Sequence, residues 1–183
     1  MNVEQAHELA RSLLADSLPR RWAHCQGVTA AASRLVPVLG RDGEALLQAA
    51  VLHDIGYSPA INATGFHPLD GARFLREQGQ ADDLVVRLVA NHSFALLEAE
   101  ERGLRGELES AFLLPEQTEL VDALVYCDMT TTPDGARTTC GERISEIVSR
   151  YGADSVVGRF IRRAEPEIRA AVGRVEERMD RRR

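Results

Sequence analysis

Apolar residues recur at helical spacing along most of the chain, and the first two such segments each have one apolar face. Residues 2–15 are predicted to form an amphipathic helix, and residues 16–19 interrupt it before a second helix over about 19–39. Pro19 suits the first turn of this second helix because it lacks a backbone N–H. The two apolar faces consist of Val3, Ala6, Ala10 and Leu13, and of His24, Val28, Ala31 and Leu35.

The segment 44–53 is apolar on nearly all sides, which predicts a helix at the centre of the fold. A turn at 39–43 precedes it, and a loop rich in Gly, Pro and Asn follows at 56–66. Pro68 then begins another helix and leaves His67 at its mouth. A further helix over residues 81–92 has one face made of Val85, Leu88, Val89 and His92.

The second half of the chain is also predicted to be helical, with one less regular stretch. Residues 103–118 are mixed and interrupted by glycine, with a loop or short turn at 112–115. From Thr118 a helix places Val121, Leu124, Val125 and Asp128 on one face, and a polar loop follows over 129–135. The remaining predicted helices cover residues 141–150, residues 154–164 and a last segment beginning at about Pro166.

Because no segment outside the loops alternates in the manner of a strand, the predicted fold is an all-α helical bundle. The 183 residues fit a single domain, 1–183, and no linker or repeat divides it. The last helix, with Ile168, Val172, Val175 and Met179 in register, could pack on the core or form an oligomer face. We expect packing, although a homo-oligomer stays open.

Composition supports helices and narrows the class of partner. The chain is 44% hydrophobic but only 5% aromatic, and its net charge is −6. An acidic protein is poorly suited to wide nucleic-acid contact, so no nucleic-acid polymer is expected as a partner. The sequence has no long apolar span for a membrane helix and no signal-peptide pattern. Three cysteines without a CxxC spacing are typical of reduced thiols, so the protein is expected to be cytoplasmic.

The most informative stretch is the His53–Asp54 pair, which ends the apolar helix just before Gly56. An unpaired carboxylate and imidazole at a buried helix end are costly, so such groups normally find partners or a metal ion. Both side chains could turn toward one point and share a divalent cation. The alternative is a polar helix end with Gly56 as a stop signal.

Further histidines and an aspartate lie on buried faces or at helix mouths. Each has a simpler explanation by itself: His24 and His92 as satisfied core residues, His67 as a helix cap, and Asp128 as a group with a protein partner. Together with His53 and Asp54 they offer six N/O donors and no thiolate, which suits Mn²⁺, Fe²⁺ or Zn²⁺. Two ions roughly 3.5–4 Å apart, bridged by Asp54, would use all six.

The order His24, His53–Asp54 and Asp128 resembles the HD-domain superfamily of metal-dependent phosphohydrolases. The stretches His67-Pro68-x-x-Gly71-Ala72 and Asn91-His92-Ser93 look like the extra histidine motifs of its dinuclear members. The resemblance covers residues 20–130 and leaves 141–181 as packing helices. Arg21-x-x-His24 looks most like small bacterial HD hydrolases, one group of which cleaves diadenosine tetraphosphate.

The resemblance implies a small phosphorylated substrate, either a nucleotide or a dinucleoside polyphosphate. It implies one or two divalent ions per chain, Fe or Mn with Zn as a third choice, which activate water and stabilise phosphoryl charge. Asp54 and Arg21 are the expected catalytic residues. The expected substrate contacts are Arg21, Asp70, Arg137 and Arg143, and the loops 57–67 and 129–143 are expected to rim the cavity.

This chain departs from the family pattern at three positions. Tyr57 follows Gly56 where many members carry a lysine, so that phosphate contact is absent. Asn91 precedes His92 where relatives often have two adjacent histidines, which bears on whether a second ion binds. The Gly-Tyr-Pro signature of cyclic-di-GMP phosphodiesterases is also missing. The alternatives are a mononuclear nucleotidase that uses His24, His53, Asp54 and Asp128, a non-catalytic metal-binding regulatory module and an HD-fold oxygenase.

Overall fold

The computed structural model describes residues 1–181, and these residues fold into helices joined by short turns. The helices are α1 (Val3–Leu14), α2 (Pro19–Ser33), α3 (Val36–Leu39), α4 (Gly43–Leu52), α5 (His67–Gln78), α6 (Asp83–Asn91), α7 (Ala95–Glu101), α8 (Arg105–Ala111), α9 (Thr118–Met129), α10 (Cys140–Tyr151) and α11 (Val156–Asp180). Short 3₁₀ helices occur at η1 (Gly40–Asp42), η2 (Ile55–Tyr57) and η3 (His92–Phe94). Within the described residues the only β pairing is one bridge between Thr131 and Arg137, so the all-α prediction is confirmed.

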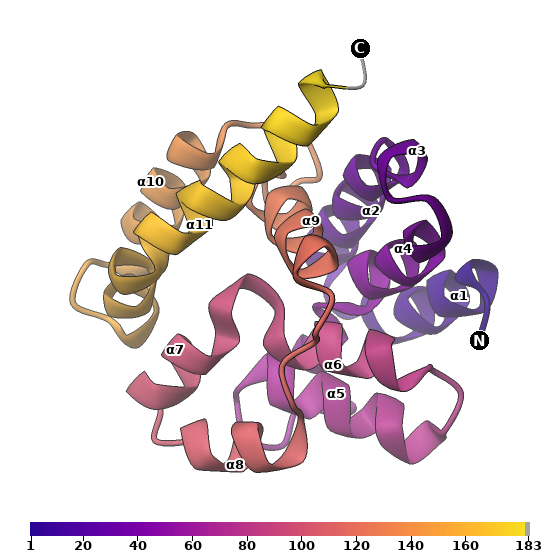
Figure 1. The fold of residues 1–183 in the computed structure, drawn as a ribbon. Helices are drawn as coiled ribbons and strands as arrows, with labels where there is room; N and C mark the ends of the chain where they lie inside the picture. Colours follow the sequence, from indigo (N-terminus) through magenta and orange to yellow (C-terminus); the bar gives the residue numbers. More distant parts are fainter. Residues whose placement is uncertain (182–183) are drawn as a thin grey trace.

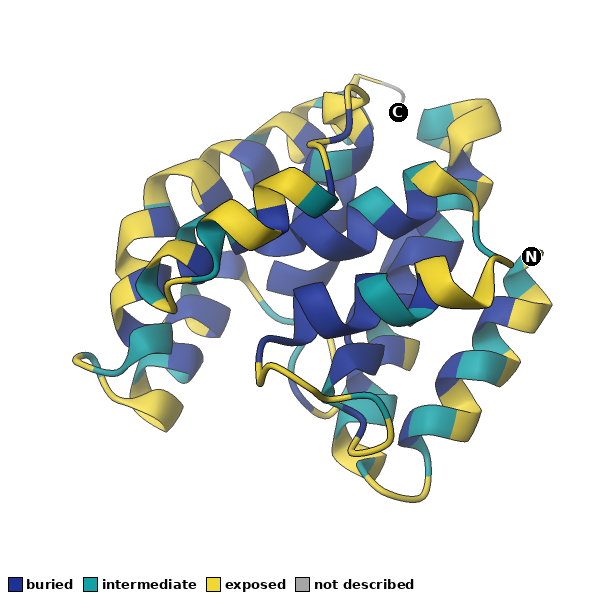
Figure 2. Ribbon diagram, turned by 90° about the horizontal axis from the view of Figure 1, so that it is seen from below, coloured by how far each residue is buried: buried dark blue, intermediate teal, exposed yellow. Residues whose placement is uncertain are grey.

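Helix α9 runs through the middle of the molecule, between α11 on one side and α2 and α4 on the other (Figure 1). Helices α5 and α6 pack against each other, and α7 and α8 form a separate corner next to them (Figure 1). The buried residues face inward from every side, while the outer faces are exposed (Figure 2). Leu46, Ala49, Ala50, Val51 and Leu52 are fully buried, which confirms α4 as a central helix.

The sequence pattern continues smoothly over residues 19–39, but the structure divides this stretch into α2 and α3. Pro37 lies at the first turn of α3. A proline has no N–H to continue an α-helical ladder, but it is tolerated in the first turn of a helix. The proline therefore starts a new helix after the chain has turned at Arg34 and Leu35.

The prediction that a separate last helix begins at about Pro166 is wrong, because α11 continues through this residue as one helix of 25 residues. Pro166 is exposed and lacks only one backbone hydrogen bond. Buried residues on both sides of it hold the two halves on the same core: Phe160, Ile161 and Ala164 before it, and Ile168, Ala171, Val172 and Val175 after it. The prediction also missed α7 and treated α8 as irregular. The final two residues of the predicted domain 1–183, residues 182 and 183, lie outside the described part.

Candidate metal centre

His53 and Asp54 follow the last residue of α4, and both are buried. The Nδ1–H of His53 donates to the carbonyl oxygen of Ala50 at 2.8 Å, whereas Nε2 has no hydrogen-bond partner. Gly56, two residues on, lies against the start of α5. A Cβ atom there would lie 2.0 Å from the carbonyl oxygen of His67, so only glycine permits this approach. The close contact brings His67 beside Asp54.

Three of the buried histidines are oriented in the same way. The Nδ1 of His24 lies 3.0 Å from the carbonyl oxygen of Thr132, and the Nδ1 of His92 lies 2.7 Å from that of Val89. A carbonyl oxygen only accepts hydrogen bonds, so the proton of each neutral ring is on Nδ1. Each ring, like that of His53, therefore presents the Nε2 lone pair to the centre, as a metal ligand must.

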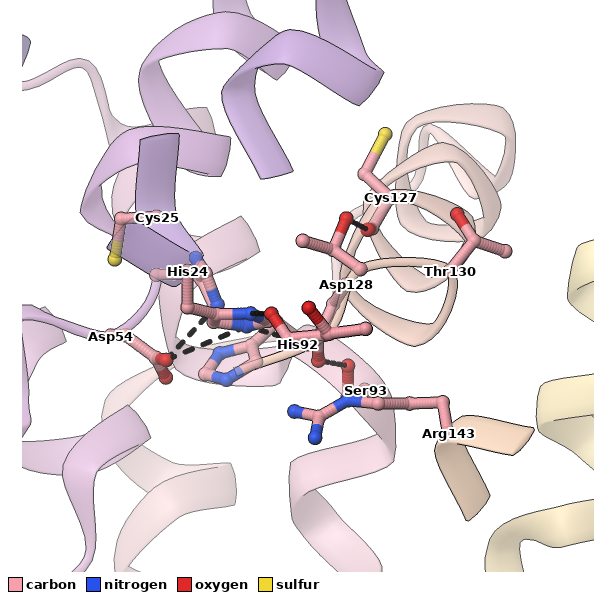
Figure 3. Close-up of polar contacts among 12 residues, drawn as sticks. His24, Cys25, Asp54, His92, Ser93, Cys127, Asp128, Thr130 and Arg143 are labelled. Atoms are coloured by element: carbon pink, nitrogen blue, oxygen red, sulfur yellow. Dashed lines mark hydrogen bonds and ion pairs between the residues drawn. The ribbon is translucent and has the colours of Figure 1, made fainter. Parts of the chain in front are cut away.

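The first group of donors consists of His24, His53 and Asp128, whose ligand atoms lie within 4.8 Å of one another. Asp128 is near the end of α9, and its Oδ1 is 3.1 Å from the Nε2 of His24. The hydroxyl of Ser93 donates to its other oxygen (Figure 3). Burial opposes ionisation of Asp128, but its close contact with His24 and the nearby charges hold its pKa well below the usual range.

The second group consists of Asp54, His67 and His92, again within 4.8 Å. The Nε2 atoms of His67 and His92 face each other at 3.1 Å. Burial, reinforced by the neighbouring imidazoles of His67 and His53, lowers the pKa of His92 to about 3. His92 is therefore neutral at physiological pH and can serve as a ligand.

Asp54 lies between the two groups, and its two oxygens face different histidines. Oδ2 is 3.3 Å from the Nε2 of His53 and 3.8 Å from that of His24, and Oδ1 is 3.2 Å from the Nε2 of His67. Burial opposes its ionisation, but Arg21 and His53 hold the pKa of this carboxyl well below its usual value. One oxygen of Asp54 thus faces the histidines of the first group, and the other faces His67 of the second group.

The residues fit divalent metal ions. The Nε2 of His53 is buried and has no hydrogen-bond partner, and the Nε2 atoms of His67 and His92 face each other. Cations would satisfy them, and the N/O character of both groups suits Fe, Mn or Zn. The side-chain amide of Asn91 donates to the carbonyl oxygen of Arg87 at 3.0 Å. The second group has three donors without it.

The turn after α6 shapes this centre at the cost of backbone strain. Ser93 and Phe94 adopt the left-handed conformation, with φ of 48° and 62°, which residues other than glycine rarely do. Two such residues in succession reverse the chain between α6 and α7. The reversal leaves His92 in the second group and directs the Ser93 hydroxyl to Asp128. Strain of this kind is typical of functional sites.

A cleft opens over the two groups. Arg21 and Arg143 line it as predicted, but from the loops expected to rim it only Tyr57, His67 and Met129 contribute besides Arg143. Much of the remaining wall comes from α7, α10 and α11, which the sequence did not indicate. These wall residues are Ala95, Glu98, Ile147, Arg150, Tyr151, Val157, Phe160 and Ile161.

Arg21 contacts the centre directly. Its Nη1 donates to Oδ2 of Asp54 at 2.6 Å, and its guanidinium lies 4.0 Å over the ring of Tyr57. Tyr57 in turn stacks on His67 with a ring separation of 4.0 Å. Burial opposes the charge of Arg21, but Asp54 raises its pKa overall. The tyrosine found in place of the family's lysine thus supports an arginine from α2.

Two predicted substrate contacts lie elsewhere. The carboxylate of Asp70 accepts hydrogen bonds from the backbone N–H and hydroxyl of Thr64, and it does not line the cleft. Its role here is to close the loop before α5. Arg137 forms the β bridge with Thr131. Its side chain lines a separate hollow with Thr138 and Glu176, so it does not reach the cleft either.

Comparison with known proteins supports the same reading of the site. The family model described as HD domain matches residues 21–126. Curated proteins named Ribonuclease Y are similar over shorter stretches: 34% identity over 70 residues in Rubrobacter xylanophilus, 32% over 89 in Parafrankia sp. and 35% over 89 in Acidothermus cellulolyticus. These stretches cover 38%, 49% and 49% of this chain but only 14%, 15% and 16% of those proteins.

No solved structure matches the chain significantly. None of the helices in residues 1–181 combines the length and the apolar character that a membrane span requires. The family match covers more than half of the chain and includes five of the six donor residues; Asp128 lies two residues beyond it. The chain therefore belongs to the HD-domain family, the superfamily of metal-dependent phosphohydrolases that its sequence resembles.

Proposed function

We propose that this protein is a phosphohydrolase that uses one or two divalent ions, Fe or Mn before Zn, to cleave a nucleotide or a dinucleoside polyphosphate. The observation that carries the proposal is the pair of buried His/Asp groups beneath a cleft lined by arginines. Metal bound there would supply an activated water molecule and neutralise phosphoryl charge. Residues 1–183 are proposed to form one HD domain, since α10 and α11 complete the cleft.

Each side chain has a distinct part in this proposal. His24, His53 and Asp128 would hold one ion, and Asp54, His67 and His92 the other, with Asp54 between them. Arg21 would hold a non-bridging phosphate oxygen, because a guanidinium fork matches phosphate geometry. In the free protein this guanidinium is paired with Asp54 at the floor of the cleft. A phosphate above that carboxylate would therefore come within its reach.

RNA is the second candidate substrate, because the curated relatives carry the name Ribonuclease Y. Those proteins are about six to seven times the length of the matched stretch, and this chain has a net charge of −6. An acidic surface disfavours the extended phosphate contacts of a polymer. We therefore place small phosphorylated compounds first and short RNA second.

A metal-loaded activity screen tests the proposal. Protein loaded with Mn, Fe or Zn would be assayed against nucleotides, dinucleoside polyphosphates, simple phosphate esters and short RNA. We expect a small nucleotide compound to be hydrolysed fastest. The variants His53→Ala and Asp54→Ala should lose bound metal and activity together, whereas His7→Ala, which removes the one histidine outside the centre, should keep both. A fully loaded protein that hydrolyses none of these compounds would favour the regulatory-module alternative.

A further inference from the structure

A row of charged residues on α10 borders the cleft but takes no part in the two donor groups. Arg143, Glu146 and Arg150 are three and four residues apart, so they lie on one face of the helix. The Oε2 of Glu146 accepts a hydrogen bond from Nη1 of Arg143, and Oε1 accepts one from Nε of Arg150 at 2.7 Å. One carboxylate thus holds two guanidinium groups, which leaves a surplus of positive charge.

Arg143 is the unusual member of this row. Its side chain is only 7% exposed, and its buried Nε–H has no hydrogen-bond partner. A guanidinium has five N–H donors, and burying it with few acceptors is costly. The side chain extends from α10 toward Ser93 and Asp128, at the inner end of the cleft (Figure 3). Such a group is incompletely satisfied by the protein and is directed where an anionic ligand would lie.

Arg150 extends the positive charge outward. It lines the main cleft and, together with Arg21, also lines the neighbouring hollow next to Pro19 and Pro133. Its guanidinium lies 5.3 Å from the centre of the Tyr151 ring, which is exposed at the cleft wall. One positive group, Arg143, therefore lies at the inner wall of the cleft. The other, Arg150, lies where the cleft meets the second hollow.

We propose that Arg143 and Arg150, held together by Glu146 in the free protein, form a second anion subsite for a phosphate group that is not cleaved. This inference rests on the proposed function and narrows it to substrates with at least two phosphate groups. A monophosphate would engage the metals and Arg21 but leave the subsite empty. Nucleoside polyphosphates and dinucleoside polyphosphates would fill both.

Calorimetric binding of inorganic tripolyphosphate to the chelator-treated 183-residue chain tests the subsite apart from the metals. We expect tripolyphosphate to bind more tightly than orthophosphate. Arg150→Gln should weaken this binding roughly tenfold to a hundredfold, the usual range for a charge-assisted hydrogen bond, and Arg150→Lys should recover part of it. Arg143→Gln should act in the same direction, but Arg150 is the safer variant because it is more exposed.

The matched control is Arg169→Gln. Arg169 forms the same i, i+4 pair with Glu165 that Arg150 forms with Glu146, but it lies on α11 outside the cleft. The Arg169→Gln variant should bind tripolyphosphate like the unmodified protein. Equal affinity for orthophosphate and tripolyphosphate, or an Arg150→Gln variant that binds tripolyphosphate unchanged, would overturn the subsite even if the enzyme is active. Arg150-dependent binding without hydrolysis of any substrate would instead keep the subsite and remove the proposed function.

Discussion

At the scale of single residues, backbone carbonyls fix the orientation of three of the four histidine donors in the candidate centre. The Nδ1 atoms of His24, His53 and His92 are each committed to a backbone carbonyl, so the neutral rings have no freedom to exchange tautomers. The arrangement costs folding free energy in the metal-free protein, because the Nε2 of His53 is left without a hydrogen bond. Metal binding should recover that cost.

Replacing His67 tests the division of the donors into two groups. The variant His67→Ala should reduce the metal content from about two ions per chain to about one, because His67 belongs only to the second group. Elemental analysis of purified protein measures this ratio, with His7→Ala as the control. A variant that still holds two ions would contradict the division. A wild-type protein that never exceeds one ion would establish the mononuclear alternative.

Arg21 offers a test of substrate contact. Arg21→Ala should lower the hydrolysis rate of the identified substrate by about tenfold to a hundredfold, as expected for a lost charge-assisted contact, while metal content is unchanged. Arg21→Lys should recover only part, since an ammonium group cannot make the bidentate contact. Arg20→Ala is the matched control, because Arg20 is exposed and pairs with Asp134. A wild-type rate in Arg21→Ala would show that Arg21 does not bind the phosphate.

At the scale of helices, the sequence predicted the elements that carry a strong apolar stripe and missed those that depend on distant contacts. Helices α4 and α9 have such stripes, so the positions of His53, Asp54 and Asp128 at helix ends could be predicted. Helix α7 follows two residues in the left-handed conformation, which no local sequence pattern predicts. The continuity of α11 through Pro166 depends on packing against α9 and α10, which outweighs the local preference to break.

The candidate site shows the same difference between features that a local sequence pattern predicts and features that depend on distant contacts. Arg21 was chosen because it lies one helical turn from His24, and Arg143 because it follows the polar loop after the helix that carries Asp128. Asp70 and Arg137 were assigned by the same reasoning, but their side chains are directed to Thr64 and to a separate hollow. Arg150 comes from a helix that sequence alone describes only as packing. Proximity in sequence to a metal-ligating residue predicts which segment lies near the site, but not the direction of each side chain in that segment.

The contact between η2 and α5 gives a prediction for stability. Gly56→Ala should destabilise the fold by roughly 1–3 kcal/mol, because the new methyl group would overlap the backbone of His67. Denaturant unfolding measures the difference. Gly173→Ala is the control: nothing lies within 4 Å of its added Cβ, so the change should be neutral or stabilising by roughly 0.4–1 kcal/mol. Equal stability of the two variants would contradict the tight contact.

At the scale of the whole molecule, the centre joins segments from most of the chain. Helices α2, α4, α5, α6 and α9 each provide or adjoin a donor residue, while α10 and α11 provide much of the cleft wall. An ion bound at the centre would therefore connect the N-terminal helices to α9. It would bind the folded chain and not the unfolded one, and so would stabilise the entire fold.

Thermal unfolding tests this coupling. Adding Mn, Fe or Zn to chelator-treated protein should raise Tm, by an amount that corresponds to about 2.7 kcal/mol when the free metal is a hundredfold above its Kd. The variant His53→Ala should show little or no rise, whereas His7→Ala should respond like the unmodified protein. A Tm that is insensitive to every metal would contradict a metal centre formed by these residues.

The position of α10 has a consequence for how such proteins diversify. The family match ends at residue 126, so Arg143, Arg150 and Tyr151 belong to a part of the chain that the shared pattern does not constrain. Under the proposed function, the anion subsite on α10 is thus encoded after Asp128, the last metal donor in the chain. Recombination or drift confined to α10 and α11 could give a descendant with an altered anion subsite and all six donor residues unchanged. A chimera carrying the α10–α11 pair of another HD protein would exchange specificity in a single step.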